Sequence, residues 1–239
     1  MILIDKYKCG YQIVPKSGSQ SVCEYFANLL NIQADEKHKA GAYIVRRKLD
    51  IGKATVPKEY YTFSFVRNPW ARFVSGYYEF LKYLEGISKG NVHHLSQQKK
   101  WAEEGGLTIL QMVELMSSKE DPPTFDTFVD FVINIEEQHG KPNGHWMSQC
   151  TKLRAFYLTD KKRRICISDY HFIGRLESFE KDLRHIAGVI GTPVDYIPWA
   201  HKKLAKSGKT YKDFYTNQKM IDDVGKRYEE DIDRFKYTF

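Results

Sequence analysis

A loop near the N-terminus carries residue types that bind phosphate or sulfate groups. Pro15-Lys16-Ser17-Gly18-Ser19-Gln20-Ser21 follows a short run of strand-forming residues and precedes apolar residues at helical spacing. This order predicts a strand, a small-residue loop and a helix N-terminus, where backbone N–H groups and the helix dipole attract anions. Lys16 adds a cation and Gly18 permits close approach of the backbone. By itself the loop also fits an ordinary strand-to-helix turn, and it is not the GxxxxGK[ST] signature, because its lysine precedes the glycine.

A second strand-to-helix junction follows the same plan. The β-rich run Tyr61–Val66 ends at Arg67, and Asn68-Pro69 then supplies a favourable N-cap and first helical residue. Arg67 is therefore expected at the carboxyl end of a strand, and Ser75 about two turns into the next helix. Ligands of open α/β sheets bind at that edge.

Strands and helices alternate along the chain. We expect strands at 11–14, 61–66 and 170–174, and helices from the end of the first loop through 30 and at 69–84, 107–116, 125–136, 179–190 and 220–232. The alternation predicts a three-layer α/β/α fold with a central, mainly parallel sheet. No repeat, low-complexity tract or linker divides the sequence, so we expect residues 1–239 to form a single domain.

The composition argues for a folded protein and is compatible with an anionic ligand. Aromatic residues make up 14% of the 239 residues, which argues against disorder. The formal net charge of +7 suits an anionic ligand such as a nucleotide, an acidic glycan or a nucleic acid, and it equally fits a solvated basic surface.

The four cysteines and the N-terminus indicate the compartment. The cysteines show no CxxC or zinc-finger spacing, so we expect reduced thiols and no metal site; Cys150 with Cys166 is the pair worth testing for a bridge. The N-terminus becomes polar too early for a signal peptide, and no apolar stretch approaches the ~20 residues of a membrane span. We expect a soluble protein, and a cytoplasmic one if the chain is full length.

Several segments resemble elements of the sulfotransferases. Residues 14–22 look like the family's 5′-phosphosulfate loop, particularly in the carbohydrate sulfotransferase branch (sulfotransferase family 2-like), and residues 63–78 resemble its 3′-phosphate segment. Further along the chain, 145–149 resemble its HWxxQ element, 172–179 its IGRxE element, and 211–216 and 228–232 its closing segments. These segments occur in the family's order over most of the chain.

The resemblance implies a P-loop-NTPase-like sulfotransferase fold, and 3′-phosphoadenosine 5′-phosphosulfate (PAPS) as donor with 3′-phosphoadenosine 5′-phosphate (PAP) as product. It implies that Arg67 and Ser75 bind the 3′-phosphate and that the loop binds the phosphosulfate through Lys16, Ser17, Gly18, Ser19, Gln20 and Ser21. Two positions depart from the family pattern: Gln20 stands where many members have threonine, and Ala71 where an acidic residue is common. The implied reaction transfers the sulfuryl group to an acceptor hydroxyl, in this branch that of a carbohydrate.

The resemblance also implies a general base. His38 lies in the segment Glu36-Lys37-His38-Lys39-Ala40-Gly41-Ala42, which resembles the branch's KHxxA element, and histidine is suited to accept the acceptor's proton. Without the resemblance, His38 would fit a solvated residue in a charged run. His145 is the competing base, and otherwise it has either an acceptor-side or a structural role beside Trp146. His145 and Trp146 are the candidates for acceptor binding. Lys16 would stabilise charge on the leaving group, and no metal is required.

Three other functions stay open from the sequence alone. One is a nucleotide-dependent phosphotransferase that uses the same loop, although the Walker lysine is absent and no Mg²⁺-binding carboxylate is evident. Another is a non-catalytic anion- or glycan-binding module. The third is a nucleic-acid binder, which only the net charge suggests.

Overall fold

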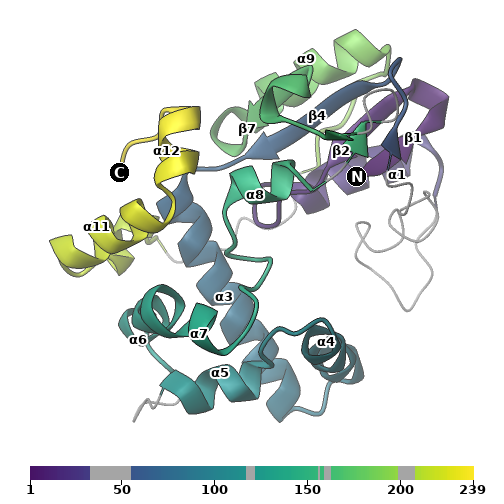
Figure 1. Cartoon of the computed structure of the whole chain (residues 1–239). Helices are drawn as coiled ribbons and strands as arrows, with labels where there is room; N and C mark the ends of the chain where they lie inside the picture. Colours follow the sequence, from purple (N-terminus) through teal and green to yellow (C-terminus); the bar gives the residue numbers. More distant parts are fainter. Residues whose placement is uncertain (33–54, 117–121, 156, 159–162, 199–207) are drawn as a thin grey trace. The chain divides into compact units, whose positions relative to one another are not determined.

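The computed structural model describes residues 1–32, 55–116, 122–155, 157–158, 163–198 and 208–239. His38, the predicted base, lies outside the described residues. The chain divides into two compact units, each assembled from two stretches of sequence. The first unit combines 1–67 with 149–203, and the second combines 68–148 with 204–239 (Figure 1).

The first unit contains a four-stranded sheet. Its strands, in spatial order, are β1 (Ile2–Ile4), β2 (Cys9–Gln12), β4 (Tyr61–Val66) and β7 (Phe172–Arg175). β1 pairs antiparallel with β2, whereas β2, β4 and β7 are mutually parallel. The mainly parallel sheet is thus confirmed, with one antiparallel edge strand that the sequence did not predict.

One face of this sheet is apolar and covered by two helices. Tyr11, Phe63 and Phe65 are buried there in one hydrophobic cluster with residues of α1 (Ser19–Leu29) and α9 (Phe179–Ile190). Side chains alternate along a strand, so these residues lie on the same face. Gly174 of β7 allows this packing, because a Cβ atom there would lie 2.6 Å from Cε1 of Phe65.

The opposite face is more polar. Gln12 and Ser64, both buried, occupy the alternate positions, and the Ser64 hydroxyl donates to the Gln12 carbonyl over 2.8 Å. The short helix α8 (Gln149–Leu153) lies on this face, where Gln12 Nε2 donates to the Lys152 carbonyl over 2.9 Å. Helices therefore flank the sheet on both faces, as the α/β prediction requires.

Smaller elements complete the first unit. A three-stranded sheet has the order β3, β5, β6 and consists of β3 (Thr55–Val56), β5 (Tyr157–Leu158) and β6 (Arg163–Arg164). Three 3₁₀ turns are η1 (Asp5–Tyr7), η3 (Ile167–Asp169) and η4 (Leu176–Ser178).

The second unit is helical in its described residues. Its elements are α3 (Pro69–Ser88), α4 (Val92–Glu103), α5 (Ile109–Met116), α6 (Phe125–Asp130), the π-helical turn η2 (Phe131–Ile135), α7 (Glu136–His139), the 3₁₀ turn η5 (Tyr211–Phe214), α11 (Gln218–Arg227) and α12 (Glu229–Phe235). The side chain of Asn68 caps α3 by accepting from the Ala71 N–H over 3.2 Å, as predicted. Phe73 of α3 packs in a core with Phe128 and Trp146.

The predicted closing helix is two helices. Tyr228 lies between α11 and α12, and its backbone (φ −110°, ψ 24°) is not helical. The Tyr228 side chain is 1% exposed, and its hydroxyl donates to the Trp146 carbonyl. The amphipathic spacing continues across the break, so periodicity alone could not locate it.

The cysteines and helices bear on two further expectations. All four cysteines are free thiols: Cys9, Cys23 and Cys150 are buried and Cys166 is exposed, so Cys150 and Cys166 form no bridge. Burial raises the pKa of the Cys9 thiol to about 12.

Among the described helices, none has the length and hydropathy that crossing a membrane would require.

Candidate functional site

The loop between β2 and α1 contains two residues in the left-handed conformation. The φ angles of Lys16 and Gly18 are 68° and 82°. They turn the chain sharply between strand and helix, and turns of this kind can direct N–H groups into an anion-binding concavity. The Val22 N–H bonds the Gly18 carbonyl over 3.1 Å, so α1 starts directly after the loop, as the sequence predicted.

Gly18 is required by both conformation and space. A Cβ atom at this position would lie 2.9 Å from Cδ1 of Leu176 and 3.5 Å from the Phe179 ring. Leu176 belongs to the predicted IGRxE element, whose contribution here is to pack against the loop. Because glycine has no side chain, Gly18 gives the first turn of α1 no side-chain cap, and this leaves the helix N-terminus suited to an anion.

Ser17 is buried and turned into the unit. Its N–H donates to the Val14 carbonyl over 3.3 Å, and its hydroxyl donates to Oε1 of Gln149 over 3.2 Å. Its exposed fraction is 0%. Both polar hydrogens of Ser17 are used inside the protein, so in this conformation Ser17 shapes the loop instead of offering donors to a ligand.

Arg67 is joined to the same glutamine and to the loop. The Arg67 N–H donates to Gln149 Oε1 over 2.9 Å, and Gln149 Nε2 donates to the Arg67 carbonyl over 2.8 Å. The Arg67 guanidinium also donates to the Lys16 carbonyl over 3.4 Å. The structure thereby brings Lys16, Ser17 and Arg67 together at the carboxyl ends of the parallel strands β2 and β4, where ligands of α/β sheets bind.

The donor set at this edge suits a strongly anionic group. Lys16 and Arg67 are cations, and no residue from 15 to 21 is acidic. Arginine presents a planar array of donors that matches a phosphate, and a helix N-terminus accommodates another. The residues present therefore fit a ligand with phosphate or sulfate groups.

Ser75 and His38, two further predicted site residues, are not among the described residues of the first unit. Ser75 is half-buried on α3 in the second unit. Its action together with Arg67 stays a prediction, as does the role of His38.

Trp146 lies in the core of the second unit. It is 1% exposed, and its indole Nε1 donates to both carboxylate oxygens of Glu136 over 2.9 Å. Gly76 of α3 packs against it, since a Cβ atom there would lie 3.5 Å from the indole ring. A side chain buried to this extent supports its neighbours and cannot contact an acceptor in this conformation.

His145 is half-buried beside aromatic residues. Asn143 Oδ1 accepts its backbone N–H over 2.9 Å and lies 3.0 Å from its Nδ1. The ring centroids of Tyr83 and Trp101 lie 6.2 and 6.0 Å from that of His145. Of the HWxxQ pair, His145 is thus the residue that an acceptor could reach.

A buried carboxylate supports the HWxxQ element. Glu136 is 0% exposed and accepts the Asn143 N–H over 2.9 Å, while its Oε2 lies 3.4 Å from the guanidinium of Arg227. Burial raises the pKa of Glu136 to about 7, and these hydrogen bonds and Arg227 oppose the rise. No pattern in the sequence marked Glu136.

The closing segment anchors the same element. Tyr228 bonds the Trp146 carbonyl, and Asp231, also fully buried, accepts from the Ser148 hydroxyl over 2.9 Å. Burial lowers the pKa of Arg72, and the charges of Tyr228 and Asp231 act in the opposite direction. The segment 228–232, which resembles a family element, therefore has a structural role within the second unit.

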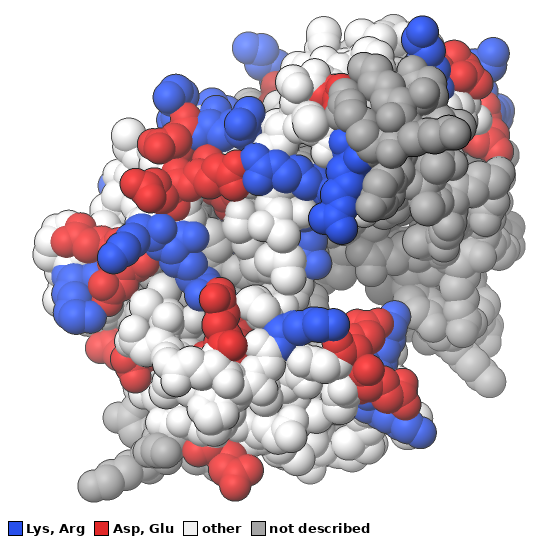
Figure 2. Space-filling model, viewed as in Figure 1, with Lys and Arg blue, Asp and Glu red and all other residues white. Residues whose placement is uncertain are grey.

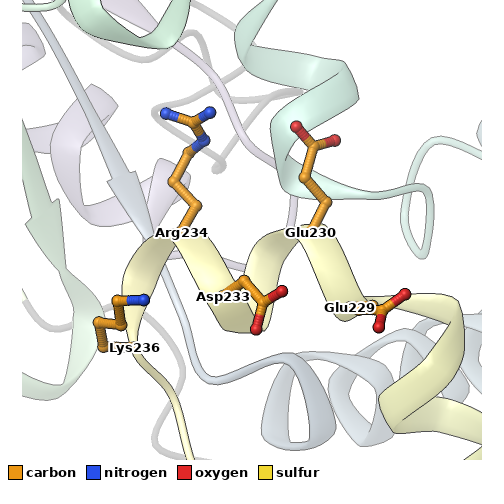
Figure 3. A pocket seen from close by; sticks show the side chains of 5 residues that line it. All are labelled: Glu229, Glu230, Asp233, Arg234 and Lys236. Atoms are coloured by element: carbon orange, nitrogen blue, oxygen red, sulfur yellow. The ribbon is translucent and has the colours of Figure 1, made fainter.

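A depression along α12 has the wrong charge for an anionic donor. It has a volume of about 570 Å³ and is lined by Glu229, Glu230, Asp233, Arg234 and Lys236. Figure 3 shows that these side chains fan out from the helix instead of converging on one point. Among the described residues, no group of three or more His, Cys, Asp or Glu side chains could hold a metal ion.

The surface charge is mixed on the face drawn in Figure 2. Lys and Arg side chains alternate there with Asp and Glu, and the coloured residues form no continuous basic surface. Proteins that follow a nucleic-acid backbone use a continuous basic surface, and the coloured residues of this face do not supply one.

Comparison with known proteins identifies the family. A model described as "Sulfotransferase family" matches residues 1–238, which span both units. The chain belongs to the sulfotransferase family. Searches of curated proteins and of solved structures gave no significant match.

The family membership confirms the resemblance to sulfotransferase family 2 and the expectation of an enzyme. This sulfotransferase has the expected α/β architecture, a sheet flanked by helices, which is consistent with a P-loop-like fold.

The sequence predicted no role for Gln149 or Glu136. Gln149 could have been noticed, because it ends the HWxxQ segment, but its partners are distant in sequence.

Proposed function

We propose that this sulfotransferase transfers the sulfuryl group of PAPS to a hydroxyl of a carbohydrate by in-line displacement. The observation that supports the proposal is the hydrogen-bonded group of Lys16, Ser17, Gln149 and Arg67, which joins the loop proposed for the phosphosulfate to the arginine proposed for the 3′-phosphate. The carbohydrate acceptor rests on the resemblance of the motifs to the carbohydrate branch.

The donor is bound by two elements in this proposal. The N–H groups at the start of α1 and the Lys16 ammonium hold the phosphosulfate, with Gly18 permitting close approach. Arg67, together with Ser75, holds the 3′-phosphate, which would distinguish PAPS from nucleotides that lack it.

Transfer proceeds by positioning and electrostatics. His38 takes the proton of the acceptor hydroxyl on an imidazole nitrogen while that oxygen bonds to sulfur and the bond from sulfur to the bridging oxygen breaks. Lys16 stabilises the negative charge that develops on the departing oxygen. No metal ion is needed in this scheme, because Lys16 and Arg67 neutralise the bisphosphate product.

Calorimetric titration with PAP, ATP and AMP tests the donor site. We expect PAP to bind without a metal, and its affinity to fall by at least about tenfold in Arg67→Ala. Lys181→Ala, which removes an exposed cation from α9 of the same unit, is the matched control and should bind PAP like the wild type. Stronger binding of ATP with Mg²⁺ would indicate a phosphotransferase instead.

Turnover with labelled PAPS tests the acceptor and the base. Sulfated oligosaccharide product, with none from small phenols or alcohols, is the expected result. Binding of PAP without turnover on any acceptor would favour a non-catalytic module. His38→Ala should abolish turnover while PAP affinity is retained; loss of turnover in His145→Ala alone would instead make His145 the base.

A further inference from the structure

Gln149 connects the two parts of the donor site through a single side chain. Its carboxamide oxygen accepts from the Ser17 hydroxyl over 3.2 Å and from the Arg67 N–H over 2.9 Å. Its amide nitrogen donates to the Arg67 carbonyl over 2.8 Å. The side chain is 0% exposed, so water does not compete for these bonds.

The residue is itself held in place by its helix. α8 is fixed to the sheet at its C-terminal end, where Lys152 O accepts from Gln12 and Leu153 O accepts from the Tyr170 hydroxyl over 2.7 Å. Gln149 is the first residue of this helix. A fixed helix therefore presents the carboxamide to both Ser17 and Arg67.

A carboxamide satisfies all of these partners, whereas an ionised or an apolar side chain does not. Arg67 offers one donor and one acceptor, its N–H and its carbonyl, and Ser17 offers a hydroxyl donor. A carboxylate can accept but cannot donate to the Arg67 carbonyl, and an apolar side chain of the same size makes none of these three hydrogen bonds. The chemistry thus requires both ends of the amide.

We infer that Gln149 is a positioning residue of the donor site, which sets the spacing between the phosphosulfate loop and the arginine for the 3′-phosphate. The inference rests on the proposed function, because it assigns those two elements to the two ends of PAPS. Gln149 touches neither reacting atom. It acts by fixing the Arg67 backbone, from which the guanidinium extends, against the buried Ser17 of the loop.

The first test uses the protein without ligand. In the wild type, the Arg67 amide should exchange slowly with solvent deuterium, because it is hydrogen-bonded to a buried group. Gln149→Met should remove that protection and raise exchange in residues 15–21. Unchanged exchange at Arg67 would overturn the inference, whatever the ligand proves to be.

The second test measures affinity for PAP by calorimetry. Gln149→Met should weaken PAP binding by about tenfold or more and raise the KM for PAPS, while the KM for the acceptor stays unchanged. If Gln149 acts through Arg67, its substitution should matter little once the Arg67 side chain is gone. Adding Gln149→Met to Arg67→Ala should therefore weaken PAP binding by much less than tenfold. Equal effects in both backgrounds would mean that Gln149 does not act through Arg67.

Tyr60→Phe is the matched control. Tyr60 is a buried residue of the same unit, and its hydroxyl donates to Asp5 Oδ1 over 2.6 Å, so this variant removes a hydrogen bond that involves neither α8 nor the loop. PAP affinity should stay within about twofold of the wild type. An equal loss in Tyr60→Phe would show general damage to the unit and would refute a specific role for Gln149.

Gln149→Glu decides the question if Gln149→Met does not fold. It keeps the shape and both acceptor bonds, but its ionised carboxylate faces the Arg67 carbonyl. PAP affinity relative to the wild type should recover as the pH falls from 8 to 5, because the protonated carboxyl can again donate to that carbonyl. A loss of PAP affinity that stays the same from pH 8 to pH 5 would refute the inference. If the wild-type protein fails to bind PAP, the proposed donor is wrong, but the deuterium-exchange test of the Gln149–Arg67 bond still stands.

Discussion

Substituting Glu136 by glutamine tests whether the buried carboxylate of the second unit destabilises the protein at neutral pH. Glu136 accepts hydrogen bonds from Asn143 and Trp146 and lies 3.4 Å from Arg227, but it is fully buried. Burial disfavours the charged form, and it raises the pKa from the ordinary value of 4.5 to about 7. Glutamine keeps an acceptor for both N–H donors and carries no charge.

The sign of the effect follows from proton binding. A carboxyl group with a higher pKa in the folded state holds its proton more tightly there, so its ionisation lowers the free energy of unfolding. The carboxyl contributes no cost below pH 4.5, an increasing cost up to about pH 7 and its full cost above that pH. The full cost is about 3 kcal/mol, of which about 2–3 kcal/mol appears between pH 5 and pH 8.

The assay is urea unfolding of the wild type and Glu136→Gln at pH 5, 6, 7 and 8. Tryptophan fluorescence reports on the second unit, which holds three of the four tryptophans, Trp70, Trp101 and Trp146. The free energy of unfolding of Glu136→Gln minus that of the wild type should rise with pH by about 2–3 kcal/mol. This difference cancels the titration of groups common to both proteins.

Glu137→Gln is the matched control. Its carboxylate lies 3.3 Å from the same Arg227, but its side chain is 65% exposed. Exposed ion pairs contribute little, so its stability relative to the wild type should vary by less than about 0.5 kcal/mol over this pH range. An equally flat profile for Glu136→Gln would refute the assignment of a raised pKa to Glu136 and the reasoning from burial.

Three further substitutions test the donor site and its supports. Gly18→Ala should destabilise the protein by about 1–2 kcal/mol in thermal unfolding, because φ is 82° and the new methyl group would contact Leu176. Adding Leu176→Ala should relieve the steric contact but not the backbone strain. Asn68→Ala should cost about 1 kcal/mol in urea unfolding, because it removes the cap of α3 and a 2.9 Å bond to the Thr238 carbonyl. Lys16→Ala should lower kcat by roughly 10²–10³ with a much smaller change in PAP affinity; equal losses in both would mean that Lys16 serves binding and not the transition state.

Much of the secondary structure could be predicted because it depends on neighbours in sequence. The β4–α3 junction follows from a β-rich run, an N-cap asparagine and a proline, and β4 has the predicted bounds, Tyr61–Val66. α3 extends to Ser88, beyond the predicted residue 84, and passes through Gly86, where the His94 ring packs so closely that a Cβ atom would not fit. The break between α11 and α12 was missed, since a buried tyrosine bonded to a distant carbonyl leaves no periodic signal.

The candidate site was predictable in its residue types but not in its assembly. A lysine and several small residues between a strand-like run and a helical pattern are local features, and they identified the loop. Ser17 was predicted to bind the ligand, whereas its hydroxyl is bonded to Gln149, a residue 132 positions away. Trp146 was predicted near the acceptor and is buried against Glu136, because the side chain's environment depends on helices that pack around it.

The sequence by itself determined the family, the alternation of strands and helices and the cationic, carboxylate-free loop, because each is written in residue type and short spacing. The tertiary structure alone decided that Arg67 lies against the loop. It also decided that Gln149, 82 residues further on, bonds both the backbone N–H and the backbone carbonyl of Arg67. It likewise decided that the carboxylates of Glu136 and Asp231 are buried. Hydrogen bonds between distant segments and the loss of water around a charge depend on how the chain packs, and neither has a signature in local sequence.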